Sequence, residues 1–290
     1  MTPPDHHCSE LRGSETCCLA ETDIGPVHIH SSGAGMPVLF LHGFPEDGLV
    51  WRPLAERLDG RFRAVMPDLP GFGLSAATCA ADPHETAKAL AACLDVMDID
   101  RFHLVAHDIG GVLAWAVASL LEKRLCSMVL LAAPHPADFI RCIWQDAPHL
   151  RRPYLDMLAS ERPLDESFAP EALVQFVGSP SPTERRRLEA SIGRLNWDIV
   201  RRYYRWLTVD NGMDYWQGLQ APACPILAIT GQLDPFVPLQ AFAATASRDL
   251  PSFNLDIVEG AGHFLHITHP EKISSKLAKW LDCPASGKAD

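Results

Sequence analysis

Residues 106–111 (AHDIGG) stand directly between an apolar run, expected to form a strand at 102–106, and an expected helix. The turn between such a strand and helix is too tight for side chains two residues before and two after its centre. Ala106 and Gly110 meet that requirement. Asp108, at the centre, is therefore predicted to project into a cleft as a nucleophile. The alternative is that Asp108 only caps the helix N-terminus, a common and chemically inert role for aspartate.

Strand and helix patterns alternate on both sides of this turn. Before it, short apolar strands are expected at 37–41 and 63–66, and a helix at 85–97; after it, a helix runs to about residue 121. The later expected elements are strands at 127–131, 225–229 and 254–258, and helices at 239–246 and 270–281. Such alternation is typical of a parallel sheet with right-handed crossovers. A turn at 31–35 is also expected to join residues 25–30 and 37–41 as a hairpin.

The alternation breaks between residues 135 and 217, where helical apolar spacing and several Pro and Gly breakers indicate a helical insertion. All four tyrosines and four of the seven tryptophans lie in this insertion. They either fill its own small core or face a substrate. The predicted organisation is an N-terminal tail (1–22), a core (23–134 and 218–283), a helical cap (135–217) and a C-terminal tail (284–290).

Bulk composition narrows the classes of partner. A formal net charge of −11, with no long Lys/Arg run, gives no electrostatic footprint for nucleic acid. No apolar stretch approaches the roughly 18 residues that cross a bilayer, and the N-terminus lacks a signal-peptide pattern. We therefore expect a cytoplasmic monomer or homodimer with neither nucleic-acid nor membrane partners. The nine cysteines include no C-x-x-C pair, so residue spacing predicts no metal and no other cofactor.

Two later segments supply partners for Asp108. TGQLD at 230–234 ends in Asp234, and GAGHF at 260–264 contains His263. Nucleophile, acid and histidine thus follow one another in the chain order of a known type of catalytic triad, each at the carboxyl end of a strand. The backbone N–H groups of Phe44 and Ile109 are expected to form an oxyanion hole.

The other histidines have no carboxylate-bearing strand end paired to them. His28 and His30 alternate on an early strand, and His266 and His269 follow His263. We interpret these four side chains as solvated or structural.

At these residues the chain resembles the α/β-hydrolase superfamily, and within it the branch of epoxide hydrolases and of haloalkane and haloacetate dehalogenases. The resemblance spans about residues 23–281 and is closest to epoxide hydrolases at HGFPE (42–46), DLPGFGLS (68–75) and APHP (133–136). It implies an α/β-hydrolase fold, with a mostly parallel eight-stranded sheet flanked by helices. It also implies that the helical cap is inserted after the sixth strand.

An aspartate nucleophile suits this branch and does not suit an esterase. Its carboxylate attacks an sp3 carbon, opens an epoxide or expels a halide, and leaves an alkyl ester on Asp108. A histidine gains nothing by deprotonating an ionised carboxylate. His263, oriented by Asp234, is therefore expected to act later, by activating water against the ester.

The leaving oxygen of an epoxide needs a hydrogen-bond donor, which the resemblance assigns to cap tyrosines. RYYR at 202–205 resembles the tyrosine-arginine segment of the epoxide hydrolase cap and indicates Tyr204. Where the family's second cap tyrosine is expected, this chain has Asp156. Either Tyr154 or Tyr215 replaces that donor, or a protonated Asp156 in an apolar cap donates the hydrogen bond itself. A third alternative is that the enzyme acts with one tyrosine, or on a different electrophile.

The substrate is expected to be small and lipophilic, because the cap is aromatic and the elbow has no paired arginines. The predicted substrate-binding residues are Tyr154, Asp156, His107, Trp144 and Tyr203.

A dehalogenase is the main alternative function. Haloalkane dehalogenases place a tryptophan just after the nucleophile, and haloacetate dehalogenases have two arginines in the elbow; here these positions hold Ile109 and Val112. Halide binding would then need cap indoles, of which Trp144, Trp197 and Trp206 are candidates. Another small-molecule hydrolase of the family, or a non-catalytic relative that binds a ligand or protein, are the remaining hypotheses.

Overall fold

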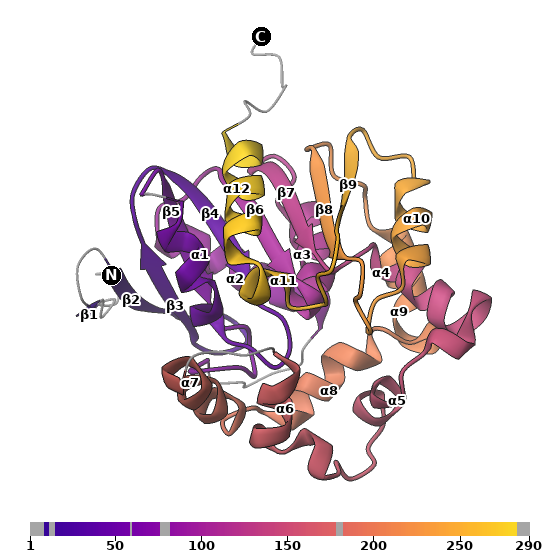
Figure 1. Cartoon of the computed structure of the whole chain (residues 1–290). Helices are drawn as coiled ribbons and strands as arrows, with labels where there is room; N and C mark the ends of the chain where they lie inside the picture. The colour runs from indigo at the N-terminus through magenta and orange to yellow at the C-terminus, as the bar shows by residue number, and fades with distance from the viewer. Residues whose placement is uncertain (1–8, 12–14, 59, 76–81, 178–181, 283–290) are drawn as a thin grey trace.

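The computed structural model describes residues 9–11, 15–58, 60–75, 82–177 and 182–282 (Figure 1). Within these residues one sheet contains nine strands in the order β1-β2-β3-β5-β4-β6-β7-β8-β9. The strands are β1 (Ser9–Leu11), β2 (Glu15–Ala20), β3 (Val27–Ser32), β4 (Met36–Leu41), β5 (Phe62–Pro67), β6 (Phe102–His107), β7 (Leu125–Leu131), β8 (Ile226–Gly231) and β9 (Phe253–Val258). The predicted parallel sheet is confirmed, because every pairing from β5 to β9 is parallel.

The N-terminal strands differ from the prediction in two ways. The predicted hairpin is wrong, because β3 pairs antiparallel with β5, and β4 lies between β5 and β6. β4 is apolar on both faces and is stabilised at the centre of the sheet, whereas β3 alternates polar and apolar residues, as strands nearer an edge do. The expected N-terminal tail contains β1 and β2, which extend the sheet beyond β3.

The strand count agrees with the expected fold when it starts at β2. Counted from β2, the sheet has the eight strands that the resemblance implies, although the sequence patterns located only β3 to β9. The cap follows β7, which is the sixth of these eight, and β1 is a short addition at the edge. The predicted C-terminal tail, residues 284–290, lies outside the described residues.

Helices cover both faces of the sheet because its central strands are apolar on both sides. In β4, Leu39 and Leu41 pack with helices α2 (Pro83–Val96), α3 (Asp108–Leu120) and α10 (Leu239–Ala246). Val38 and Phe40 point to the opposite face and pack with α1 (Arg52–Glu56) and α12 (Pro270–Leu281). The predicted bounds of α10 and α12 are confirmed. The remaining core helices are η1 (Gly48–Trp51) and α11 (Leu265–Thr268).

The described parts of the segment between β7 and β8 consist of helices and the loops that join them, without a strand. Its helices are α4 (Pro136–Arg141), η2 (Cys142–Asp146), η3 (Pro148–Leu150), α5 (Pro153–Ala159), η4 (Glu166–Phe168), α6 (Pro170–Phe176), α7 (Pro182–Ile192), α8 (Trp197–Arg205) and α9 (Val209–Gly218). Figure 1 shows α5 to α8 gathered at one end of the sheet as a cap. Among the described residues, no helix has both the length and the apolar character to cross a membrane.

Candidate active site

The turn between β6 and α3 holds Asp108 in the geometry expected of a nucleophile. Its backbone φ is 48°, in the left-handed region that non-glycine residues seldom adopt. Gly110 is required here, because a Cβ at that position would lie 2.4 Å from the carbonyl oxygen of His42. The Asp108 carboxylate accepts a hydrogen bond from the Phe44 N–H at 3.0 Å, and the cap position of α3 is occupied by His107. The structure thus contradicts the helix-cap alternative for Asp108.

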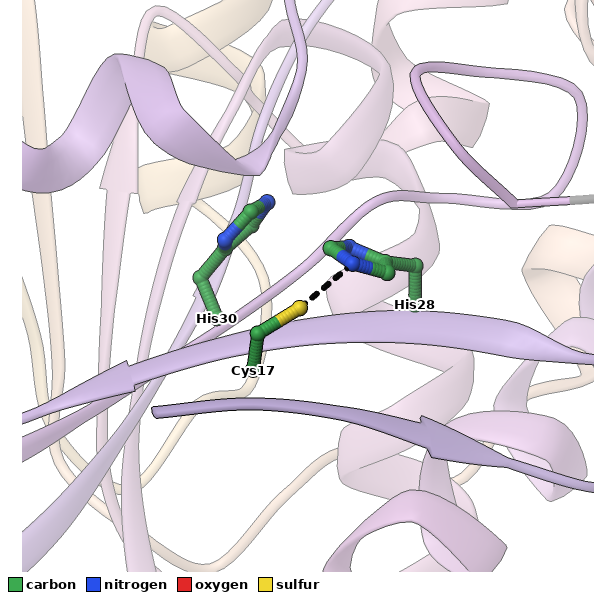
Figure 2. A group of neighbouring side chains, drawn as sticks. All are labelled: Cys17, His28 and His30. Atoms are coloured by element: carbon green, nitrogen blue, oxygen red, sulfur yellow. Dashed lines mark hydrogen bonds between the residues drawn. The ribbon is translucent and has the colours of Figure 1, made fainter. Parts of the chain in front are cut away.

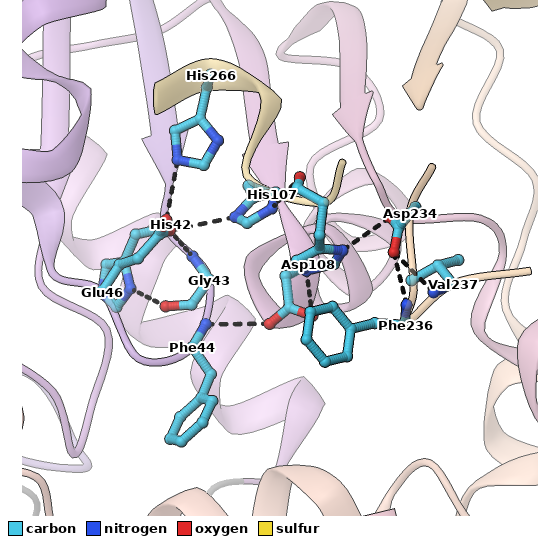
Figure 3. Close-up of polar contacts among 11 residues, drawn as sticks. His42, Gly43, Phe44, Glu46, His107, Asp108, Asp234, Phe236, Val237 and His266 are labelled. Atoms are coloured by element: carbon cyan, nitrogen blue, oxygen red, sulfur yellow. Dashed lines mark hydrogen bonds and ion pairs between the residues drawn. The ribbon is translucent and has the colours of Figure 1, made fainter. Parts of the chain in front are cut away.

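Asp108, His263 and Asp234 converge at the carboxyl ends of β6, β9 and β8. Figure 3 shows Asp108 and Asp234 with their polar contacts. His263 Nε2 lies 3.4 Å from Asp108 Oδ2, and His263 Nδ1 lies 2.8 Å from Asp234 Oδ2. The other oxygen of Asp234 accepts the backbone N–H groups of Phe236 and Val237, at 2.8 and 3.0 Å. These bonds fix the Asp234 carboxylate, and it in turn fixes the orientation of the imidazole.

The two carboxylates control the charge of His263. Burial alone would lower the pKa of His263, but Asp234 and Asp108 outweigh burial and raise it to about 10. Burial likewise opposes ionisation of Asp108, yet the hydrogen bond and charge of His263 hold the pKa of Asp108 below its usual range. The resting site is therefore an imidazolium between two carboxylates.

A buried network behind Asp108 holds the predicted oxyanion donor in place. Glu46 is fully buried, and its Oε2 accepts the Gly43 N–H at 2.9 Å and lies 3.2 Å from His107 Nδ1. His266 Nε2 lies 3.0 Å from the other oxygen, Oε1. Fixing Gly43 fixes the next peptide, whose N–H at Phe44 points at Asp108. Sequence analysis missed Glu46 and His266, although Glu46 lies in the quoted HGFPE segment and His266 follows His263 by one helical turn.

Ile109, the second predicted oxyanion donor, follows Asp108 in the first turn of α3, where backbone N–H groups have no intrahelical acceptor. Its side chain is 1% exposed. Its part in an oxyanion hole stays a prediction.

A cavity of about 130 Å³ opens beside Asp108 and His263. Its walls are apolar apart from the triad residues, Ser167 and two cap tyrosines, Tyr154 and Tyr204. The two phenol rings meet edge to face, 6.2 Å apart. Burial, followed by the charge of Asp108, raises the pKa of both tyrosines well above the ordinary value. Both hydroxyls therefore remain protonated donors.

The chain matches the Alpha/beta hydrolase family over residues 38–275, which is most of its length. The chain belongs to this family. It is 26% identical over 307 aligned positions to epoxide hydrolase 2 of Siraitia grosvenorii, covering 88% of this chain and 94% of that protein. It is 27% identical over 255 positions to the pimeloyl-[acyl-carrier protein] methyl ester esterase of Aeromonas salmonicida, covering 85% and 95%. The structure of an epoxide hydrolase from Vigna radiata shares its fold, with a TM-score of 0.78 at 21% identity over 94% of this chain and 99% of that one.

Three predicted substrate-binding residues of this α/β hydrolase do not line the cavity beside the triad. Asp156 is paired with Arg151 at 3.4 Å, and its side chain is 43% exposed, so it is not the buried, protonated donor considered above. The Trp144 indole donates to the Leu207 carbonyl at 3.0 Å, and the Tyr203 hydroxyl donates to the Pro70 carbonyl at 3.2 Å. Their polar groups are thus engaged in structural bonds.

His107, a fourth predicted substrate-binding residue, lies behind the nucleophile of this hydrolase. It is fully buried between Glu46 and His263, with its Nε2 3.2 Å from the His263 carbonyl oxygen. It does not line the cavity, because strand β6 directs alternate side chains to opposite faces and Asp108 turns away from it.

Sequence analysis missed most of the apolar wall. Phe168, Leu173 and Phe176 come from η4 and α6 of the cap, while Phe236 and Phe264 follow the triad residues Asp234 and His263. Phe236 and Phe264 could have been predicted from the sequence, because they lie close in sequence to Asp234 and His263. The three cap residues could not, because local sequence patterns do not encode the path of a helical cap over a sheet.

The described residues include two groups of side chains that could hold a metal ion. One is Glu46, His107 and His266; the other is Cys17, His28 and His30. In the first group, Glu46 already faces both imidazoles and the Gly43 N–H, so its contacts serve the oxyanion turn. The second group is considered below.

Proposed function

We propose that this hydrolase converts an epoxide to a vicinal diol through a covalent alkyl ester on Asp108. The observation that carries the proposal is the shared cavity, where an ionised aspartate, a histidine and two protonated tyrosines meet. Nucleophile and leaving-group donors come from opposite sides, Asp108 from the core and the tyrosines from the cap. An epoxide ring fits this arrangement because attack and ring opening occur on opposite sides of one carbon.

In the first step, a carboxylate oxygen of Asp108 attacks an epoxide carbon and the carbon–oxygen bond of the ring breaks. Tyr204 and Tyr154 donate hydrogen bonds to the departing oxygen, which takes a proton as the alcohol forms. Their pKa values are raised partly by the charge of Asp108. Ester formation removes that charge, so the tyrosines become better acids at the moment when a proton is needed.

In the second step, His263 takes a proton from water, and the hydroxide attacks the ester carbonyl. The ester no longer carries the negative charge of Asp108, so the pKa of His263 falls from its resting value. The imidazolium gives its proton to the tyrosine that protonated the alcohol, and the neutral imidazole becomes available as a base. The Phe44 N–H, already 3.0 Å from the carboxylate, stabilises the oxyanion, together with the N–H of Ile109. Collapse of the intermediate releases the diol and leaves one water oxygen in Asp108.

The cavity also indicates the class of epoxide. Asp108, Tyr154 and Tyr204 also line a second, mostly apolar space of about 20 Å³ beside Phe139 and Leu155, which is room for little more than one water. The larger cavity is therefore the one that can hold a substituent of the epoxide. An uncharged epoxide with an apolar substituent fits this cavity better than an anionic substrate.

A dehalogenase is less well supported. It would use the same triad but needs N–H donors for the departing halide. Of the three candidate indoles, Trp144 is already bonded to the Leu207 carbonyl. Neither Trp197 nor Trp206 is among the residues that line the cavity beside Asp108. Tyrosine hydroxyls suit an oxygen leaving group, and they are the donors in this cavity.

Single turnover in heavy-oxygen water tests the covalent mechanism. With enzyme in excess over a lipophilic epoxide such as styrene oxide, we expect the label in the peptide that contains Asp108, while the first diol formed carries no label. His263→Gln is the informative variant, since it should accumulate an unlabelled ester. Label in the first diol and none in Asp108 would rule out the ester. Halide release from haloalkanes without diol formation from any epoxide would instead establish the dehalogenase.

A further inference from the structure

A second group of reactive side chains lies on strands β2 and β3, away from the cavity. Cys17 on β2 pairs in register with His30 on β3, and His28 is two residues earlier on β3. Alternate residues of a strand point to the same face, so both imidazoles and the thiol gather on one side of the sheet. Figure 2 shows the Cys17 sulfur with the two imidazole rings on either side.

The three side chains contact one another closely. Cys17 Sγ is 2.5 Å from His28 Nε2, and the two imidazole rings meet edge to face at 4.5 Å. One donor atom from each residue lies within 4.8 Å of the other two. His30 is 7% exposed, and its Nδ1 has no hydrogen-bond partner in the described structure. A buried nitrogen without a partner destabilises the folded protein unless something binds it.

We propose that Cys17, His28 and His30 form a binding site for a thiophilic transition-metal ion, with Zn²⁺ as the ion of choice. One thiolate and two imidazoles are ligands that Zn²⁺ binds tetrahedrally, and they are poor ligands for Mg²⁺ or Ca²⁺. Water occupies the fourth position in this proposal. The site adds a metal to a chain whose residue spacing predicted none, and the hydrolytic mechanism does not use it.

The geometry needs only small side-chain movements. With Zn–S of about 2.3 Å and Zn–N of about 2.0 Å, tetrahedral ligand atoms lie roughly 3.4–3.6 Å apart. The contact between Cys17 and His28 must therefore lengthen by about 1 Å, and the ion takes the place of the proton between them. Binding converts the Cys17 thiol to a thiolate bonded to zinc and releases that proton to solvent.

The surroundings supply an outer partner for a ligand imidazole. His28 Nδ1 lies 3.7 Å from the buried carboxyl group of Asp68. A carboxylate behind the free nitrogen of a ligand histidine is the usual second partner in zinc sites. The positive charge of Arg187, which acts on His30, is paired with Asp47.

Bound zinc would cross-link β2 to β3 and stabilise the N-terminal edge of the sheet. Its contribution to stability follows from its affinity, since a ligand that binds only the folded state raises the unfolding temperature. None of the three residues lines the cavity beside Asp108. We therefore expect zinc to change thermal stability and to leave epoxide turnover unchanged.

Calorimetric titration of the tag-free, chelator-treated, reduced protein with Zn²⁺ tests the proposal. We expect one equivalent to bind and raise the unfolding temperature, while Mg²⁺ does neither. Cys17→Ser and His30→Gln should each weaken binding by about 10- to 100-fold or more. Cys18→Ser is the matched control, because this neighbour on β2 points to the opposite face, and its affinity should equal that of the wild type. Co²⁺ should give a thiolate charge-transfer band that Cys17→Ser abolishes.

Three other residues near the N-terminus, His6, His7 and Cys8, are also of types that bind zinc. The titration is therefore repeated in a variant that lacks all three side chains. In a His6→Gln/His7→Gln/Cys8→Ser variant, the affinity should remain that of the wild type. Loss of binding in that background, unchanged binding in both Cys17→Ser and His30→Gln, or no saturable binding by the wild type would each overturn the proposal. Circular dichroism and cooperative thermal unfolding establish that the variants are folded, so a failed epoxide assay bears on the proposed function and not on the metal site.

Discussion

The charge of Asp108 should set the pKa of His263, and Asp108→Asn removes that charge with little change in shape. The amide is also neutral like the proposed alkyl ester, so this variant reports the state of His263 in the intermediate. His263 Nε2 and Asp108 Oδ2 are 3.4 Å apart. At that separation two unit charges interact by about 5 kcal/mol at an effective dielectric constant of about 20, and by about 1 kcal/mol in water.

The Asp108 side chain is 20% exposed, so the true interaction lies between these limits. Because about 1.4 kcal/mol corresponds to one pKa unit, we expect the pKa of His263 to fall by about 1–3 units from its resting value of about 10. A base that is free near neutral pH is what ester hydrolysis requires. The fall therefore links formation of the ester to activation of water.

Heteronuclear NMR of the His263 ring, recorded from pH 5 to 11, measures this shift directly. Asp156→Asn is the matched control, since it removes a carboxylate that is paired with Arg151 and should leave His263 unchanged. Intact mass must verify that the asparagine has not reverted to aspartate. A change in the His263 pKa of less than about half a unit in Asp108→Asn, below even the limit for water, would refute the electrostatic coupling.

The same coupling predicts how stability depends on pH. The pKa of His263 is raised in the folded protein, so its contribution to stability is complete below the unfolded value of about 6.5 and is lost as pH rises through about 10. In Asp108→Asn that loss should be complete at a lower pH, which denaturant unfolding at a series of pH values will show.

Three further predictions, two of them with a control variant, test the site and the fold. Tyr204→Phe should lower kcat for an epoxide by about 10²- to 10³-fold with unchanged stability. The control Tyr203→Phe should cost about 1 kcal/mol of unfolding free energy and leave kcat within about twofold. Equal effects of the two variants on kcat would contradict the assignment of Tyr204 as the donor. Asp156→Asn should leave kcat/KM unchanged in a steady-state assay. A large fall in kcat/KM would instead indicate that Asp156 donates a hydrogen bond to the substrate. Gly110→Ala should lower the free energy of unfolding, measured in urea, by about 1–3 kcal/mol. The reason is that the new Cβ would lie 2.4 Å from the carbonyl oxygen of His42. In the control Gly218→Ala the new Cβ has no atom within 4 Å, so the free energy of unfolding should be unchanged.

Local sequence patterns could not decide which cap side chain is the second hydrogen-bond donor. Tyr154 and Asp156 both lie in α5 and were both considered as the second donor. Residues two apart on a helix point in nearly opposite directions, about 200° apart, so one faces the cavity when the other faces solvent. The choice between them depends on how α5 packs on the core, and the structure places Tyr154 at the cavity and pairs Asp156 with Arg151.

The sequence by itself determined the alternation of strands and helices from β6 onward, the tight turn at Asp108 and the convergence of Asp108, Asp234 and His263. It could do so because the strands of a parallel sheet all end at one edge, so a residue placed after each strand is brought to the same region. Tertiary structure alone decided that β3 pairs with β5, and that Cys17 lies opposite His30. Such pairings, and the cap's path over the sheet, depend on contacts between segments distant in sequence, which no local pattern of residues encodes.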